Sequence, residues 1–355
     1  MSLTTWLPLL ILLSSLVPGI AIFLLREESH LLRTLLNMSG AILKLVFVGI
    51  LIWGVFHDQM IENRWTLAPG LDLVLHADAL SVLFVSLSTL LWLVTTIYAI
   101  GYLENAPHRS RFFGFFSLCV TATVGLALAG NLFTFVIFYE MLTLSTYPLV
   151  SHKGDEKTVR SARVYLGILI SASIGLLLPA IIWTYSVAGT GDFTMGGILR
   201  GHIDGPQVGL LLGLFVFGAA KAAVMPVHRW LPAAMVAPTP VSALLHAVAV
   251  VKAGVFTIVK IIVYVFGVDF LFSEPSSGWL FWAAAFTIIA ASVVALRQQN
   301  LKRLLAYSTV AQLSYVVMAS AILKPLAEVG AAMHMLAHSF GKITLFFAAG
   351  SIYTA

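Results

Sequence analysis

The fold is decided by the stretch K-A-A-V-M-P-V-H-R-W-L-P-A-A-M-V-A-P-T-P, residues 221–240, which lies between two long apolar runs. Pro226 cannot donate a hydrogen bond to the carbonyl of Ala222, so a helix through this stretch must kink or break close to Lys221. At membrane depth such a break is tolerated only where the freed backbone groups are buried in protein or line a polar cavity. The stretch therefore predicts a broken membrane helix with a lysine beside the break, an arrangement that suits an ion site.

The composition of the whole chain supports a membrane location. Of its 355 residues, 60% are hydrophobic and only 10% are charged, whereas a soluble domain carries about 25% charged residues. This excludes the soluble globular, disordered, collagenous and disulfide-scaffold classes. The single cysteine, Cys119, excludes an intrachain disulfide and a cysteine metal cluster. The 20 lysines and arginines are spread along the chain and form no nucleic-acid patch.

Apolar runs of about 20 residues are long enough to cross a bilayer as helices. They predict an all-α, polytopic membrane helix bundle of about eleven transmembrane helices. The first span lacks a basic leader and a cleavage site, so we expect a retained helix. The predicted spans cover residues 3–25, 32–56, 79–101, 112–129, 131–150, 162–188, 208–226, 242–266, 279–296, 304–323 and 328–350.

The basic residues predict the orientation of this bundle. Counted from an outside N-terminus, the loops on the inner side hold twelve basic residues and the outer loops hold Arg64, Arg200 and Lys324. Inner loops of membrane proteins are enriched in lysine and arginine, so we expect an outside N-terminus. We also expect a location in the bacterial inner membrane. The inner loops contain Arg26, Arg33, Arg109, Arg111, Lys153, Lys157, Arg160, Arg163, Arg229, Arg297, Lys302 and Arg303.

Five lysines remain inside the predicted spans, and an ionisable residue at that depth is a functional candidate because its insertion costs at least about 2.5 kcal/mol. The only carboxylate well inside a span is Glu140, and the excess of lysine predicts that several lysines exchange protons. His246, His334 and His338 add further titratable groups. Lys260 is close to its helix end and is expected to reach the interface, and Lys44 fits either transport or a contact with a neighbouring subunit. The five lysines are Lys44, Lys221, Lys252, Lys260 and Lys342.

His334, His338 and Lys342 are spaced four residues apart and form one stripe about 12 Å long on a helix. His-x-x-x-His can bind metal, but Met335 follows His334 where a zinc protease has glutamate, so we predict no metal site. The stripe suits a proton relay. The preceding span offers a neutral stripe, Ser308, Gln312 and Tyr315, that could hold water. No phosphate loop, dinucleotide fingerprint or nucleophile elbow is present, so we expect no cofactor and no redox or catalytic site in this chain.

Four stretches resemble one family. They are N-L-F-T-F-V-I-F-Y-E (131–140), the long run V-M-P-V-H-R-W-L-P through V-V-K-A-G-V-F (224–256), L-K-R-L-L-A-Y-S-T-V-A-Q-L-S-Y (301–315) and H-M-L-A-H-S-F-G-K (334–342). The chain resembles the antiporter-like membrane subunits: the proton-pumping subunits of respiratory complex I, the large subunits of Mrp-type Na+/H+ antiporters, and membrane subunits of energy-conserving hydrogenases.

The resemblance implies two inverted five-helix repeats, each with a broken helix. We expect an N-terminal three-helix segment (1–110), a first repeat (111–268) broken near Lys221–Pro226, and a partial second repeat (279–355). It also implies that Glu140 pairs with Lys221, that His246 or Lys252 is the central station, and that His334, His338 and Lys342 form the relay, with Lys44, Ser308 and Gln312 as secondary candidates. Because the sequence stops at Ala355, before a second broken helix, we expect a C-terminally truncated family member or a partner that supplies the missing half.

The resemblance predicts a proton or Na+/H+ translocating subunit of a multi-subunit membrane complex, with H+ and possibly Na+ as its ions. The joint presence of His246 and Lys252 favours an Mrp-type cation/proton antiporter. The alternative is the pump subunit of an NADH-quinone oxidoreductase or an energy-conserving hydrogenase. A purely structural scaffold is a third reading, but it leaves the buried charges unexplained.

Overall fold

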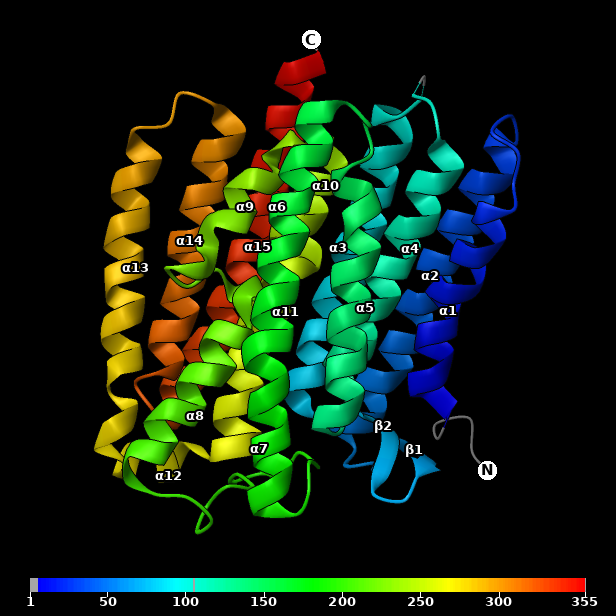
Figure 1. The fold of residues 1–355 in the computed structure, drawn as a ribbon. Helices are drawn as coiled ribbons and strands as arrows, with labels where there is room; N and C mark the ends of the chain where they lie inside the picture. Colours follow the sequence, from blue (N-terminus) through cyan, green and yellow to red (C-terminus); the bar gives the residue numbers. More distant parts are fainter. Residues whose placement is uncertain (1–5, 105, 355) are drawn as a thin grey trace.

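A computed structural model describes residues 6–104 and 106–354 as a bundle of roughly parallel and antiparallel helices with one small β-hairpin at its edge (Figure 1). The start of the first predicted span, residues 3–5, and the last residue, Ala355, lie outside the described residues. Eight helical segments of the described chain are long and apolar enough to cross a membrane. The predicted all-α membrane bundle is confirmed, and the number eleven stays a prediction.

The first half of the bundle is built from long, mostly uninterrupted helices. Helices α1 and α2 form an antiparallel pair, and α4 packs against α1 with its own buried face (Figure 1). Small residues allow this close approach, since a Cβ on Gly19 would collide with the side chain of Ser117. The helices are α1 (Leu7–Phe23), α2 (His30–Phe56), α3 (Ala79–Tyr102), α4 (Arg109–Ala127), α5 (Leu132–Val150), α6 (Glu156–Ala172) and α7 (Leu178–Ala188).

Helices α6 and α7 form one span joined by a π-helical turn at Ser173–Leu177. Pro179, two residues after this turn, has no N–H for the helical ladder, which explains why the hydrogen bonding changes register there. The second half of the bundle contains α8 (Gly205–Gly218), α9 (Trp230–Ala233), α10 (Thr239–Ala243), α11 (Val250–Lys260), α12 (Val268–Ser273), α13 (Trp279–Leu296), α14 (Leu301–Ser320) and α15 (Pro325–Thr354).

The predicted loop at 57–78 contains a hairpin that the sequence analysis did not predict. Strands β1 (Glu62–Ala68) and β2 (Leu71–His76) pair antiparallel around a turn with Gly70 at φ +79°. Arg64 on β1 binds Asp72 on β2 at 2.8 Å and Asp192 in the α7–α8 connection at 2.9 Å. The Arg64–Asp192 ion pair therefore holds the hairpin against the end of the bundle, where Figure 1 shows it beside the ends of α1 and α5.

The segment Thr239–Phe266 is a single buried span in the centre of the bundle, and 94% of its most apolar window is buried inside the protein. It consists of α10, a π-helical turn at Leu244–Val248, α11 and a second π-helical turn at Ile261–Phe266. π-Helical turns inside helices are frequent at functional sites. The first of these turns contains His246, and α11 contains Lys252.

His152 lies directly after α5 and is 9% exposed, with its ring edge-on to Phe112 at 5.4 Å. Burial, and then the charge of Arg111, lower the pKa of His152 to about 4. The folded pKa lies below the ordinary value of about 6.5, so the neutral ring contributes stability above pH 6.5 that is lost as the pH falls toward 4.

We therefore expect the thermal midpoint of the detergent-solubilised protein to fall between pH 6.5 and 4, with a loss of about 1–2 kcal/mol from His152 after solvent screening. The variant His152→Gln should flatten this part of the pH profile, because it has no ring to protonate. His202→Gln, at an exposed position, is the control and should keep the wild-type slope. An unchanged profile in His152→Gln would contradict the assignment.

Candidate functional site

The broken helix begins earlier than the position of Pro226 suggests. Helix α8 ends at Gly218, so the predicted continuous span 208–226 is wrong in its last turns. A 3₁₀ turn at Ala220–Ala222 follows, Ala223 adopts a left-handed conformation at φ +58°, and the Met225–Pro226 peptide bond is cis. The chain then crosses through short helical turns to α10, as Figure 1 shows between α8 and α9. Pro226 therefore lies within the break and not at its start.

The break leaves backbone N–H and carbonyl groups without helical hydrogen bonds, and side chains from other segments bind them instead. The indole of Trp230 donates to the carbonyl of Ala220 at 2.8 Å, and the hydroxyl of Thr287 on α13 accepts from the N–H of Met225 at 3.3 Å. The N–H of Lys221 approaches the hydroxyl of Tyr139 at 3.4 Å. These partners explain how irregular backbone can exist in the interior of a membrane bundle.

Lys221 is completely buried beside this break, and its ammonium points to α5. It donates to the hydroxyl of Thr143 at 2.6 Å and to the carbonyl of Tyr139 at 3.0 Å, and it lies over the Tyr139 ring. The sequence analysis missed both partners. Thr143 is three residues after Glu140 and so lies on the same face of a helix, a signal that was available in the sequence.

The expected Glu140–Lys221 ion pair does not form among the described residues. Both Glu140 carboxylate oxygens are buried and have no hydrogen-bond partner in the described part of the chain, and the Lys221 ammonium binds the Tyr139 and Thr143 oxygens instead. Glu140 is next to Tyr139 on α5, but successive helix positions point in directions about 100° apart. The two side chains form no ion pair in this structure, and the pairing that the resemblance implied stays a prediction.

A second group of buried bases joins α11 to α15. Lys252 is completely buried, and its ammonium contacts Nδ1 of His338 at 2.5 Å. The His338 ring is parallel to the His334 ring one turn away, with 6.4 Å between the ring centroids. The predicted stripe on residues 334–342 thus faces the centre of the bundle at His338 and Lys342, whereas His334 is only half-buried beside Tyr315.

His246 and Lys342 both bind helix α14. His246 Nδ1 lies 3.0 Å from the Thr309 hydroxyl, and its other nitrogen, Nε2, is buried without a partner among the described residues. Lys342 donates to the Ser308 hydroxyl at 2.9 Å and to the Leu305 carbonyl at 3.2 Å. Ser308 therefore belongs to the cluster, and Thr309 is an additional member that the sequence analysis missed.

Two secondary candidates lie apart from this cluster. Lys44 is fully buried between α1 and α3, where it donates to the Ser15 hydroxyl at 2.6 Å and lies 5.0 Å from the Trp92 ring centroid. These partners belong to this chain, and both alternatives, transport and a contact with a neighbouring subunit, stay predictions. Gln312 is half-buried on α14.

Lys260 does not reach the interface, contrary to the prediction. It is 1% exposed and forms an ion pair with Asp78 at 3.4 Å, and it donates to the Ala129 carbonyl at 2.9 Å. Asp78 also caps helix α3 by accepting from the N–H of Ser81 at 2.7 Å. This pair ties α11 to the start of α3 and to the α4–α5 connection, which fixes one end of the helix that contains Lys252.

The two groups of buried bases meet at Gly254 on α11. A Cβ at Gly254 would overlap the backbone of Lys221 and Ala222, so α11 packs against the break with no room for a side chain. Lys252 is two residues earlier on the same helix. The geometry therefore places Lys221 and Lys252 in adjoining segments, linked by a direct backbone contact.

The described residues contain no group of three or more histidine, cysteine, aspartate or glutamate side chains that could hold a metal ion. Most of the cluster consists of nitrogen bases that bind hydroxyl and carbonyl oxygens or one another. Such groups can accept and release protons across a hydrogen bond. The arrangement is therefore suited to proton transfer between Lys252 and His338, with the hydroxyls of Thr143, Ser308 and Thr309 as further hydrogen-bonding groups.

Comparisons with known proteins agree with this architecture. The sequence pattern described as NADH:quinone oxidoreductase/Mrp antiporter, TM, matches residues 129–355, and that of the complex I chain 5 N-terminus matches residues 66–113. The chain belongs to the NADH:quinone oxidoreductase/Mrp antiporter transmembrane family and is an integral membrane protein. The predicted resemblance is confirmed.

Relatives of two kinds are similar to this chain. It is 31% identical to NAD(P)H-quinone oxidoreductase chain 5 of Synechocystis sp., over 98% of this chain and 52% of that protein. It is 33% identical to the A/B subunit of a probable K+/H+ antiporter of Rhizobium meliloti, over 84% of this chain and 29% of that protein. The chain thus spans about half the length, or less, of these curated relatives.

Two solved structures share the fold. One is the Mrp complex from Dietzia sp., with a TM-score of 0.79 at 25% identity, over 97% of this chain and 37% of that chain. The other is a membrane-bound sulfane sulfur reductase, an archaeal respiratory membrane complex, with a TM-score of 0.81 at 22% identity, over 98% and 71% of the two chains. The second likeness concerns the fold alone.

The tight packing at Gly254 gives one test of the site. Gly254→Ala adds a methyl group against the Lys221–Ala222 backbone, so we expect α11 to move and the thermal midpoint to fall, by a free energy of about 1–3 kcal/mol. The matched control is Gly49→Ala on α2, where a Cβ meets no atom within 4 Å. It should be neutral or slightly stabilising. Equal stability of the two variants would refute the contact.

The buried Lys260–Asp78 pair gives another test. Asp78→Asn keeps an oxygen that can cap α3 but leaves the Lys260 ammonium without a carboxylate, which should cost about 3 kcal/mol of unfolding free energy. The double variant Asp78→Asn/Lys260→Met should recover part of that loss in thermal unfolding. Glu62→Gln, at the exposed Arg64 network, is the control and should cost under about 1 kcal/mol. No recovery in the double variant would count against a buried charge at Lys260.

Proposed function

We propose that this chain is an ion-translocating part of a multi-subunit membrane complex, and that protons move along Glu140, Lys221, His246, Lys252, His334, His338 and Lys342. The observation that supports this proposal best is the Lys252–His338 contact, in which two bases at 0% and 8% exposure share a hydrogen bond. Isolated charges are expensive at membrane depth, and a cluster of bases there indicates a transport path more than a stabilising core.

The proposed transfer uses the chemistry of the paired bases. A proton can reside on the Lys252 amine or on the His338 imidazole, and at hydrogen-bond distance it can pass between them with little movement of heavy atoms. The His334 ring continues the path along α15, and Lys342 lies one turn further on the other side of His338. Lys221 and Glu140 form the neighbouring station at the break, and their side chains need a rotation to pair.

We further propose that the complex is of the Mrp type and exchanges a monovalent cation for protons. The similarity to the Rhizobium meliloti antiporter protein and to the Mrp complex from Dietzia sp. supports this reading. The second candidate is the pump subunit of a quinone oxidoreductase or hydrogenase complex. It is favoured by the Synechocystis sp. chain 5, which matches nearly the whole of this chain.

The proposed location is the bacterial inner membrane with the N-terminus outside. The α1–α2, α3–α4, α5–α6 and α13–α14 connections gather at one end of the bundle in Figure 1, and the hairpin of β1 and β2 lies at the other. Arg26, Lys153 and Arg297 lie in three of these connections, and Arg109 begins α4. The enrichment of basic residues on the inner side supports this orientation. We also propose three segments: an N-terminal three-helix segment (1–110), a first five-helix repeat (111–268) with its broken helix near Lys221–Pro226, and a partial second repeat (279–355).

The function is tested by ion flux in proteoliposomes that contain the assembled complex. Lys221→Ala and Glu140→Ala should each reduce proton flux by about tenfold or more, since each removes a station of the path. Lys44→Ala, at a buried lysine outside the cluster, controls for the loss of a buried charge. Full proton flux in both site variants would contradict the proposal. Proton flux that depends on a monovalent cation would favour the antiporter, and proton flux that does not would favour the pump subunit.

A further inference from the structure

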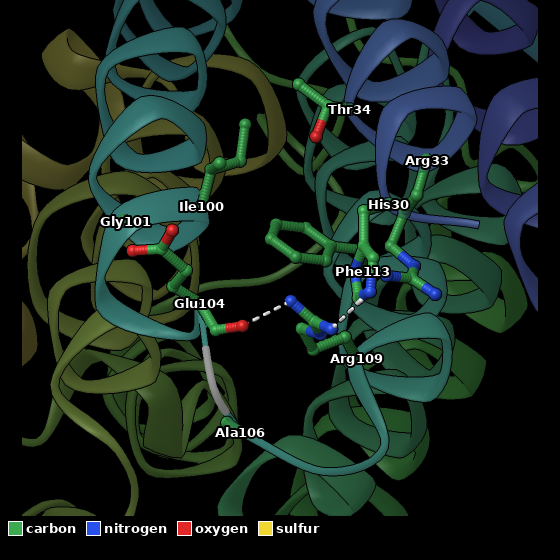
Figure 2. Close-up of a pocket in the computed structure, with 9 residues that line it drawn as sticks. All are labelled: His30, Arg33, Thr34, Ile100, Gly101, Glu104, Ala106, Arg109 and Phe113. Atoms are coloured by element: carbon green, nitrogen blue, oxygen red, sulfur yellow. Dashed lines mark hydrogen bonds between the residues drawn. The ribbon is translucent and has the colours of Figure 1, made fainter. Parts of the chain in front are cut away.

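One cavity among the described residues lies away from the buried bases, at the end of the bundle that contains the α1–α2 and α3–α4 connections. It has a volume of about 770 Å³ and opens between the first turns of α2, the end of α3 and the start of α4. Figure 2 shows Glu104 on one side and Arg109, His30 and Arg33 on the other. The proposed proton path uses none of these residues.

The cationic side of the cavity keeps free donors. Arg109 donates to the Glu104 backbone carbonyl and to His30 Nε2, so two of its five N–H groups are used and its Nε is buried without a partner in the described chain. Arg33 is 3% exposed, is held by Ser110 and by two loop carbonyls, and forms an ion pair with Glu27 at 3.8 Å. Its Nη1 makes no hydrogen bond within the described residues.

The start of α4 is already occupied by a carboxylate of this chain. Glu27 accepts from the N–H groups of Arg109 and Ser110 at 2.8 and 3.1 Å. The anion-binding capacity of that helix end is therefore used, and the guanidinium of Arg109 is the donor left for a ligand. Across the cavity, the Glu104 side chain is exposed and makes no ion pair among the described residues, because Arg109 binds its backbone oxygen instead.

The membrane-facing surface beside the cavity is apolar. Leu31 and Leu35, on the first turns of α2, are 74% and 55% exposed, and Ile97, on the last turns of α3, is 55% exposed. A molecule that fits the whole region has a negative group for Arg109, a positive group for Glu104 within the same head, and apolar chains that extend along α2 and α3. A phospholipid with a primary ammonium has all three parts.

We propose that this cavity binds the headgroup of a phosphatidylethanolamine-type phospholipid, with the phosphate on Arg109 and the ammonium on Glu104. Basic pockets between helices near a membrane surface bind lipid headgroups, and Arg–phosphate contacts are among the stronger charge-assisted hydrogen bonds. The carboxylate opposite the arginine selects the ammonium, because a glycerol headgroup has no positive charge and a choline headgroup has no N–H to donate. The inference does not depend on the direction of ion transport or on the proposed function.

The test measures lipid binding to the delipidated complex by native mass spectrometry, with phosphatidylethanolamine, phosphatidylglycerol, phosphatidylcholine and inorganic phosphate as separate probes. The wild-type protein should prefer phosphatidylethanolamine. Arg109→Gln should weaken binding of all three lipids by about tenfold, because a charge-assisted bond is lost. Glu104→Gln should remove the preference for phosphatidylethanolamine over phosphatidylglycerol and retain phosphate-dependent binding. Glu104→Gln leaves the Arg109 bond to the backbone intact, so the variant should fold.

Matched controls lie on α6 at the same end of the bundle. Arg160→Gln and Glu156→Gln change exposed residues outside the cavity and should bind lipid as the wild type does. The proposal is overturned if Glu104→Gln keeps the wild-type lipid preference, if the control variants lose binding to the same degree, or if inorganic phosphate displaces the lipid.

Discussion

The structure depends on one constraint, the need of every backbone polar group inside a bilayer for a partner within the protein. The break after Gly218 violates regular helix hydrogen bonding, and it exists because Trp230, Thr287 and Tyr139 supply the missing partners. The same constraint makes α11 the centre of the fold. Gly254 brings this helix into contact with the break, and the Lys260–Asp78 pair anchors its other end. Lys252 lies two residues before Gly254 on this fixed helix, and its ammonium contacts His338 on α15.

The break and α11 determine which partners each buried lysine has, and these partners decide whether the lysine is suited to proton transfer. A lysine that binds only hydroxyl, carbonyl or imidazole groups lacks the carboxylate that would make it a stable ion pair. Lys221, Lys252 and Lys342 are all of this kind, whereas Lys260 has Asp78 and serves as a structural tie. The distinction separates groups suited to carrying protons from a group that holds helices together, and the sequence alone presents all four as lysines in apolar runs.

Much of the architecture could be predicted from the sequence because each membrane helix corresponds to a long run of apolar residues. The approximate spans, the proximity of Lys221 to a break, and the burial of Lys252, His246, His338 and Lys342 are visible as apolar runs, prolines and stray charges. What could not be predicted depends on contacts between distant segments. The end of α8 at Gly218, the partners Tyr139 and Thr143 of Lys221, and the Asp78 partner of Lys260 are fixed by packing across the bundle. The hairpin at 62–76 was missed because its strands are short and partly polar. The Glu140–Lys221 pair came from the resemblance, and one helix step separates Glu140 from the position that contacts Lys221.

The central claim is that Lys252 and His338 work as one unit in proton transfer. The most direct measurement is a double-variant cycle on proton flux in the assembled complex, with Lys252→Met, His338→Gln and the two combined. If the proton passes between these two groups, either single variant interrupts the same step, and the double variant should be no slower than the slower single variant. Losses that multiply, so that the double variant shows the product of the two single reductions, would show independent roles and contradict the account.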